Sequence, residues 1–121
     1  MNCTSLETVD MPIGLKEIFP RAFSGCRSLE RIFLPDELTF LGFLAFERCT
    51  ALRYVSLPES LTTIRRGTFG RCHSLSSIVI PNSVSSIENG AFAGCTSLQS
   101  VYLPDSLKEI CRGAFSHCTS L

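Results

Sequence analysis

Hydrophobic and polar positions along this chain repeat with a fixed step of 23 residues. Five aliphatic columns carry the pattern, and they begin at Leu6, Val9, Met11, Leu15 and Ile18. A fixed period between about 20 and 50 residues is the signature of a repeat array, in which each repeat buries its apolar face against its neighbours. The pattern therefore predicts a solenoid of stacked coils rather than a domain built from layers of long elements.

Each repeat contains two candidate strand segments separated by a turn. Leu-x-x-Val-x-Leu alternates in the way of a short strand, and the proline that follows it lacks an N–H group and so ends the strand. The second segment, Leu-x-x-Ile followed by Ala-Phe, supplies the opposite wall and is too short for a long helix. We expect parallel strands, turns and short helical turns, with coils about 4.8 Å apart. A phenylalanine column should fill the core: Phe23, Phe46, Phe69, Phe92 and Phe115.

The same alignment divides the chain into five units and the start of a sixth. The units span residues 3–25, 26–48, 49–71, 72–94 and 95–117, and the partial unit spans 118–121. We expect residues 1–121 to form a single array. Natural solenoids close their ends with atypical capping repeats, and no cap is evident here. We therefore expect an excerpt of a longer array whose terminal coils expose apolar edges and favour self-association.

The most regular stretch lies between Cys95 and Cys118 and reads C-T-S-L-x-S-V-x-L-P-D-S-L-x-x-I-x-x-G-A-F-x-x-C. This pattern resembles the BspA-like, or TpLRR-class, leucine-rich repeats, and the likeness covers essentially the whole chain. The resemblance implies a leucine-rich-repeat solenoid used for binding or adhesion, located at a bacterial cell surface or secreted, or else a member of the large protist families. It carries no catalytic residues. The first two units depart from it at Ile13-Gly14, at Phe19-Pro20-Arg21 and at 40–44.

Composition and charge exclude several classes of function. The charges of eleven basic and eleven acidic residues cancel, and the pI is near 6.7. The composition therefore does not indicate the basic surface that nucleic-acid binding usually requires. No apolar run approaches 18 residues, so the sequence predicts no membrane-spanning segment. The first 20 residues lack a charged region followed by an apolar stretch, and no secretory signal is visible among them.

Six of the seven cysteines form one column, and neighbours in it should lie about one coil apart, within the reach of a disulfide. The column contains Cys3, Cys26, Cys49, Cys72, Cys95 and Cys118. We expect a buried ladder of reduced thiols, with disulfides and a metal site as alternatives. Zinc sites use C-x₂₋₄-C spacing, which is absent. Cys111 belongs to a variable column, where we expect an inert, free thiol exposed to solvent, with a thiolate modestly favoured by Arg112 as the alternative.

The sequence offers no catalytic, cofactor-binding or metal-ligating constellation, so we do not expect an enzyme or a cofactor. Two histidines form no triad without a nucleophile held beside them, and no glycine-rich phosphate loop is present. The polar column after proline favours turn positions over a calcium site, and it contains Asp36, Glu59, Asn82 and Asp105. The triplet Asn2-Cys3-Thr4 fits a glycosylation sequon, but it includes the cysteine column and we do not assign it.

The concave strand face is the usual contact surface of a solenoid. Its exposed columns here combine aromatic and arginine residues, which are enriched at binding hot spots, although strands favour aromatic residues in any case. We predict partner binding by Arg31, Phe33, Arg53, Tyr54, Val79 and Tyr102.

Two further groups are candidates. One is an apolar patch or irregular core filler, formed by Phe19, Phe40, Phe43 and Leu44. The other is a basic group that suits a sulfated glycan or an acidic peptide, unless it forms a solvated outer face: Arg48, Arg53, Arg65, Arg66 and Arg71.

Three hypotheses of function follow. The first is a non-catalytic adhesion module that binds a host or neighbouring-cell protein. The second is an intracellular scaffold or regulatory module that binds an endogenous partner, which reduced thiols throughout would favour because oxidising compartments seldom leave cysteines free. The third is an array that positions an enzyme domain lying outside these residues.

Overall fold

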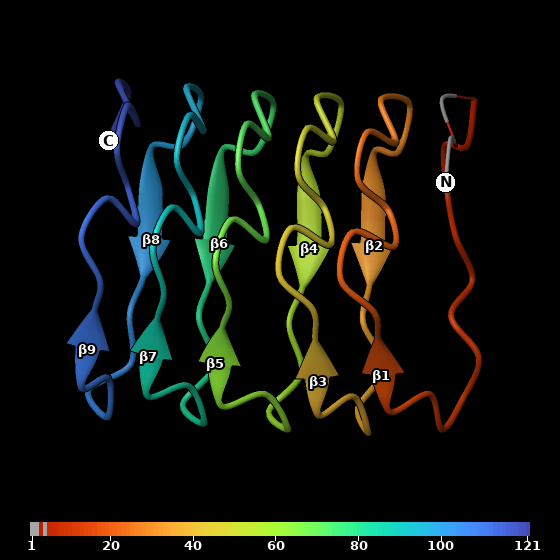
Figure 1. Cartoon of the computed structure of the whole chain (residues 1–121), viewed down its shortest axis with the longest axis horizontal. Helices are drawn as coiled ribbons and strands as arrows, with labels where there is room; N and C mark the ends of the chain where they lie inside the picture. Colours follow the sequence, from red (N-terminus) through yellow and green to blue (C-terminus); the bar gives the residue numbers. More distant parts are fainter. Residues whose placement is uncertain (1–2, 4) are drawn as a thin grey trace.

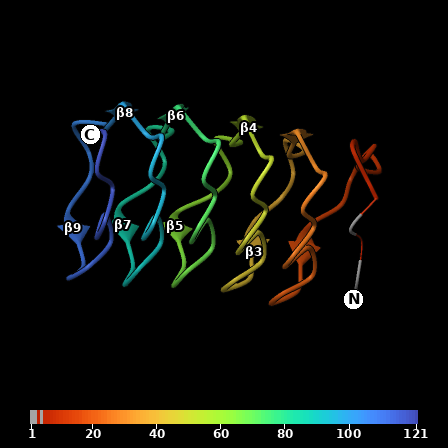
Figure 2. The same ribbon diagram turned by 90° about the horizontal axis from the view of Figure 1, so that it is seen from above.

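The computed structural model describes Cys3 and residues 5–121, so Asn2 and Thr4 of the sequon lie outside the described residues. The described part contains nine short strands in two rows, one on each side of a stack of coils (Figures 1 and 2). The upper row of Figure 1 holds the three-residue strands: β2 (Arg31–Phe33), β4 (Tyr54–Ser56), β6 (Ser77–Val79) and β8 (Ser100–Tyr102). The lower row holds the two-residue strands: β1 (Glu17–Ile18), β3 (Phe40–Leu41), β5 (Thr63–Ile64), β7 (Ser86–Ile87) and β9 (Glu109–Ile110).

The three-residue strands arise from the Leu-x-x-Val-x-Leu segment. Their pairing is parallel, with Ile32 opposite Val55 and Ile78 opposite Val101. Thr8 occupies the position equivalent to Arg31 in the preceding repeat, and these two residues form an isolated parallel bridge. Side chains alternate across a strand, so the central residue enters the core while its two neighbours face outward. The predicted alternation is confirmed.

The two-residue strands form the opposite wall that the Leu-x-x-Ile segment predicts. They also pair in parallel, with Ile18 opposite Leu41 and Ile64 opposite Ile87. Four members of this isoleucine and leucine column are buried, whereas Ile110 in β9 remains 47% exposed because no further coil packs on it.

The proline that follows the first segment of each repeat opens a tight turn between the two rows, as predicted. The carbonyl oxygen of Pro35 accepts a hydrogen bond from the amide of Leu38 at 3.1 Å, and the other four units repeat this bond at 3.1 to 3.2 Å. The acidic and asparagine column after proline occupies the second position of these turns.

The segment that returns from the second row to the cysteine consists of consecutive turns, and the described residues include no helix. The amide of Ala45 donates to the carbonyl of Gly42, and the amide of Cys49 donates to that of Phe46, both at 3.2 Å. These are the expected helical turns, but each ends after one turn because the next amide, such as that of Phe46, donates to the following coil at Thr68 instead. In the described part, no helix is long and apolar enough to cross a membrane.

The core is a continuous column between the two rows. Five phenylalanine rings stack along it with centroids 5.2 to 5.6 Å apart and nearly parallel planes: Phe23, Phe46, Phe69, Phe92 and Phe115. The three central rings are fully buried. The predicted phenylalanine core is therefore confirmed, and the overall architecture is the parallel-strand repeat solenoid that the 23-residue period indicates.

The strand pairing is interrupted at the middle of the array. The upper row divides into the pairs β2–β4 and β6–β8, and the lower row divides between β3 and β5. The central coil therefore pairs with the preceding coil through one wall and with the following coil through the other. The repeat pattern of the sequence gives no sign of this interruption. On the upper row, a hollow lies where β4 and β6 are not paired.

Candidate binding surface

The outward side of β2, β4, β6 and β8, here called the long-strand face, presents a row of large apolar side chains to solvent. Phe33 is 59% exposed, Tyr54 47%, Val79 64% and Tyr102 61%. They are held outward because the central residues of the same strands point into the core. Exposed apolar side chains that follow one sheet face in series are unusual for a soluble surface and are typical of a contact site.

Two of these aromatic residues contact each other across neighbouring strands. The ring centroids of Phe33 and Tyr54 lie 5.4 Å apart, with the ring planes tilted by 50°. This geometry is favourable for aromatic pairs and restricts the freedom of both rings. Arg31 and Arg53 are exposed on the same strand row and its flank. The structure thus brings the predicted residues together on one face, although it contains no partner that would test their role.

A hollow lies on this face where β4 and β6 are not paired. Its volume is about 230 Å³, and it is bounded by Tyr54 and Ser56 on one side and by Ser77 and Val79 on the other. Leu57 and Glu59 extend it toward the proline turns. The hollow is large enough for one side chain of a partner. Sequence reasoning missed it, because a uniform repeat pattern does not reveal where pairing between coils is interrupted.

The apolar group around the first two units does not form one exposed patch. Phe19 is 67% exposed, whereas Phe40 and Phe43 are half-buried. The guanidinium of Arg65 lies 4.7 Å from the ring centroid of Phe40, and that of Arg66 lies 5.1 Å from that of Phe43. Such contacts stabilise by about 0.5–1 kcal/mol at exposed sites. These two rings are therefore covered by arginines from the next coil.

The structure also separates the predicted basic group. Arg65 and Arg66 cover the phenylalanines on the lower row, and Arg53 flanks the long-strand face. Arg48 and Arg71 lie in successive coils immediately before the cysteine column, together with Arg27 and His73 around a second hollow. The sequence could have indicated Arg27 and His73, because they directly follow Cys26 and Cys72 and share one column with Thr50.

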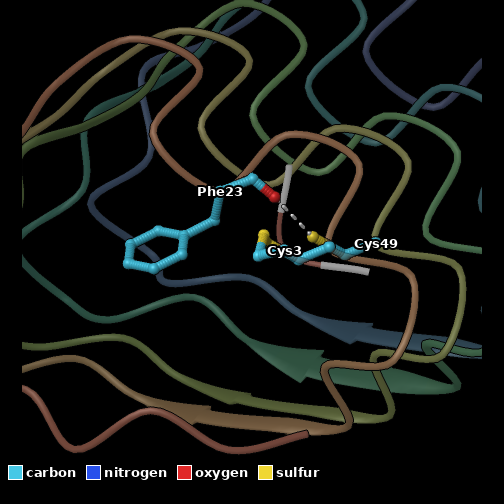
Figure 3. Close-up of a disulfide and its surroundings, with 4 residues drawn as sticks. Cys3, Phe23 and Cys49 are labelled. Carbon is cyan, nitrogen blue, oxygen red and sulfur yellow. Dashed lines mark hydrogen bonds between the residues drawn. A yellow bond between two sulfur atoms is a disulfide. The ribbon is translucent and has the colours of Figure 1, made fainter. Parts of the chain in front are cut away.

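The cysteine column forms the predicted ladder with one exception. The thiols of Cys49, Cys72, Cys95 and Cys118 donate hydrogen bonds of 3.1 to 3.3 Å to phenylalanine carbonyls 26 residues earlier in the chain. At the first step Cys3 and Cys26 form a disulfide, with Cα atoms 4.8 Å apart. Figure 3 shows the surroundings of the disulfide at Cys3, where the sulfur of Cys49 donates a hydrogen bond to the carbonyl oxygen of Phe23. The expectation of reduced thiols throughout is wrong at this pair, where the sulfur of Cys26 is bonded to that of Cys3 instead of donating to a phenylalanine carbonyl.

Burial controls the chemistry of the remaining thiols. Desolvation raises the pKa of Cys49 and of Cys95 to about 12 and that of Cys72 well above its usual value. The pKa of Cys111 is also raised, first by desolvation and then by the carboxylates of Glu109 and Glu88. Cys111 is a free thiol, as predicted, but the expected lowering of its pKa by Arg112 is wrong, because desolvation and these two carboxylates raise that pKa.

Within the described residues, no three histidine, cysteine, aspartate or glutamate side chains gather in a way that could hold a metal ion. His73 follows the buried Cys72, and His117 precedes the half-buried Cys118. Both histidines are exposed, as their positions next to the cysteine column predict.

Comparison with known proteins identifies the fold family. The model of the BspA-type leucine-rich repeat region matches residues 1–121 with six copies. A leucine-rich cell surface protein of Faecalibacterium prausnitzii A2-165 is 35% identical, with a TM-score of 0.93, over 95% of this chain and 30% of its own. A leucine-rich repeat protein of Bacteroides ovatus is 32% identical, with a TM-score of 0.78, over 96% of this chain and 36% of its own.

The leucine-rich repeat protein of T. pallidum, TpLRR, is 25% identical with a TM-score of 0.53, and the match covers 95% of this chain and 78% of TpLRR. No curated protein matches the sequence. The chain spans about a third of the length of the first two structures. The 23-residue coil, its two parallel strand rows and the full-length match together place this chain in the BspA-type leucine-rich repeat family.

Proposed function

We propose that this chain is a protein-binding module that recognises its partner through the long-strand face. The observation that carries the proposal is the exposed series Phe33, Tyr54, Val79 and Tyr102 beside the hollow between β4 and β6. Aromatic anchors next to a pocket are the usual centres of binding energy, where truncation of one residue often costs 2 kcal/mol or more. Arg31 and Arg53 add charged groups at the rim.

The partner in this proposal is a protein at a cell surface, and binding serves adhesion. Support comes from the similar chain of F. prausnitzii, which is described as a leucine-rich cell surface protein. The disulfide between Cys3 and Cys26 also suits an oxidising compartment.

A second candidate is an intracellular scaffold that binds an endogenous partner through the same face. The five free cysteines favour it, because oxidising compartments seldom leave so many thiols unpaired. The two candidates share the contact surface and differ in where the partner occurs.

Photo-crosslinking tests both the surface and the compartment. The cross-linking amino acid p-benzoylphenylalanine is placed at the position of Tyr54, and in a control protein at that of Phe19, which is exposed outside the long-strand face. Each protein is exposed to an extract of cell-surface proteins and to a cytosolic extract. A discrete cross-linked protein with the first probe but not the second is expected, and the extract that yields it decides between adhesion and scaffold.

Competition supplies the specificity control. Unlabelled wild-type protein should suppress the cross-link, whereas the triple variant F33S/Y54S/Y102S should compete at least about 100-fold less well with an unchanged circular dichroism spectrum, because three potential hot spots are removed. The variant I13S/F19S, which removes exposed apolar side chains elsewhere, should compete like the wild type. Equal competition by the triple variant would exclude the long-strand face.

A further inference from the structure

Another hollow of the molecule lies beside the cysteine column, away from the long-strand face. Its volume is about 270 Å³, and its lining consists of Arg27, Arg48, Thr50, Arg71 and His73. These residues come from three successive coils, directly before and after Cys26, Cys49 and Cys72. No acidic and no aliphatic residue belongs to the lining. The hollow therefore concentrates positive charge in a chain whose basic and acidic residues balance over its whole length.

The backbone fixes the two central arginines in register. The amide of Arg48 donates to the carbonyl of Gly70 at 2.8 Å, and the amide of Arg71 donates to that of Ala93 at 2.7 Å. In the described part of the chain, neither guanidinium is neutralised by an ion pair. Stacked like charges repel, so this arrangement is unfavourable until an anion lies between them.

Both arginines also occupy a left-handed backbone conformation. The φ angle is 61° at Arg48 and 59° at Arg71, whereas the equivalent positions in two other coils are Gly25 and Gly94, at 77° and 76°. Glycine adopts this conformation without the steric cost that a side chain brings. His117, the equivalent position of the last coil, has a φ angle of 61° as well. The left-handed conformation therefore belongs to the fold, and two of its three non-glycine residues in this column are the arginines of the hollow.

The composition of the lining indicates the chemistry of the ligand. Arginine forks bind oxyanions through paired hydrogen bonds, and the three arginines, from two successive coils, can contact different oxygens of one tetrahedral group. A carboxylate offers only two oxygens. No hydrophobic residue of the kind that would hold an apolar side chain of a peptide belongs to the lining. The peptide N–H groups of Thr50 and His73 form none of the backbone hydrogen bonds of these turns, so they remain available as further donors.

We propose that this hollow, the basic hollow, binds a sulfate group of a sulfated glycan. The site is separate from the long-strand face, so a glycan and a protein partner can bind at the same time. Salt weakens the interaction, because the contacts are ionic and the hollow is open to solvent.

The test uses the whole chain and a fluorescent heparin-derived oligosaccharide, with the desulfated oligosaccharide as the matched probe. Fluorescence anisotropy should detect binding of the sulfated probe and at least tenfold weaker binding of the desulfated one. The variant R48G/R71G should bind the sulfated probe at least tenfold less well. Its glycines match the backbone of the equivalent coils, so its melting temperature should be no lower than that of the wild type.

Two controls separate a built site from general charge. The variant K108S/R112N removes the same number of positive charges from exposed positions of the last unit and should bind within twofold of the wild type. The variant F33S/Y54S/Y102S should also bind the glycan normally, so failure of the proposed protein contact leaves this result unaffected. Equal losses in K108S/R112N and R48G/R71G would overturn the proposal. So would binding of a doubly phosphorylated peptide with no binding of the glycan.

Discussion

The thiol of Cys72 donates a hydrogen bond to the carbonyl oxygen of Phe46, 3.3 Å away and one coil earlier. The same oxygen accepts the amide of Cys49, so one carbonyl closes a turn and joins two coils. Equivalent bonds recur along the column. The repeated cysteine is therefore a small apolar residue that can also donate a hydrogen bond. Its thiol links each coil to the phenylalanine carbonyl of the preceding coil.

Replacing Cys72 by Ala should lower the free energy of unfolding by about 1–3 kcal/mol, because the buried sulfur and its hydrogen bond are both lost. Urea denaturation followed by circular dichroism measures the change. The matched variant Cys111→Ala removes a thiol outside the ladder and should change stability by no more than about 0.5 kcal/mol. Similar losses in both variants would contradict the role assigned to the ladder.

Stability should decrease at alkaline pH. The pKa of Cys49 and of Cys95 is raised to about 12 by burial, whereas the pKa of a thiol in the unfolded chain stays near 9.0. The folded state then holds its protons more tightly, so the stabilisation is complete below pH 9 and is lost as the pH rises toward 12. Urea titrations at pH 7, 9 and 10.5 measure this slope. The variant C49A/C95A should show a shallower slope, and an unchanged slope would exclude these thiols as its cause.

Replacing Phe69 by Ala should cost about 3–5 kcal/mol, the range for a fully buried aromatic side chain. Its ring stacks between Phe46 and Phe92 at 5.6 and 5.5 Å, so the cavity would interrupt the core at its centre. Thermal or urea unfolding measures the loss. Phe33→Ala removes an exposed ring and should cost far less. Equal stability of the Phe69→Ala variant and the wild type would mean that the phenylalanine column is not the core.

Thiol counting tests the disulfide. Unfolded without reductant, the protein should incorporate iodoacetamide at five cysteines, and after reduction at all seven. In the folded protein Cys49, Cys72 and Cys95 should resist labelling, because they are buried and protonated. Mass spectrometry of the labelled peptides identifies each site. Labelling of Cys3 and Cys26 before reduction would disprove the bridge.

Much of the fold follows from the sequence because a repeat array makes its long-range contacts between equivalent positions. Once Ile32 and Val55 share a column, stacking sets them one coil apart, and the same step predicts the buried strand centres, the proline turns and the phenylalanine stack. The exposure of Phe33, Tyr54 and Tyr102 follows equally from alternation along a strand.

The tertiary structure alone decided what differs between coils. The interruption of pairing between β4 and β6 is one such difference, and the hollow beside Tyr54 lies where these two strands are not paired. The contact of Arg65 with Phe40, the disulfide of Cys3 with Cys26 and the gathering of Arg27 with Arg71 depend on side-chain directions across neighbouring coils. A column alignment specifies which residues are neighbours, whereas only packing determines how their side chains meet.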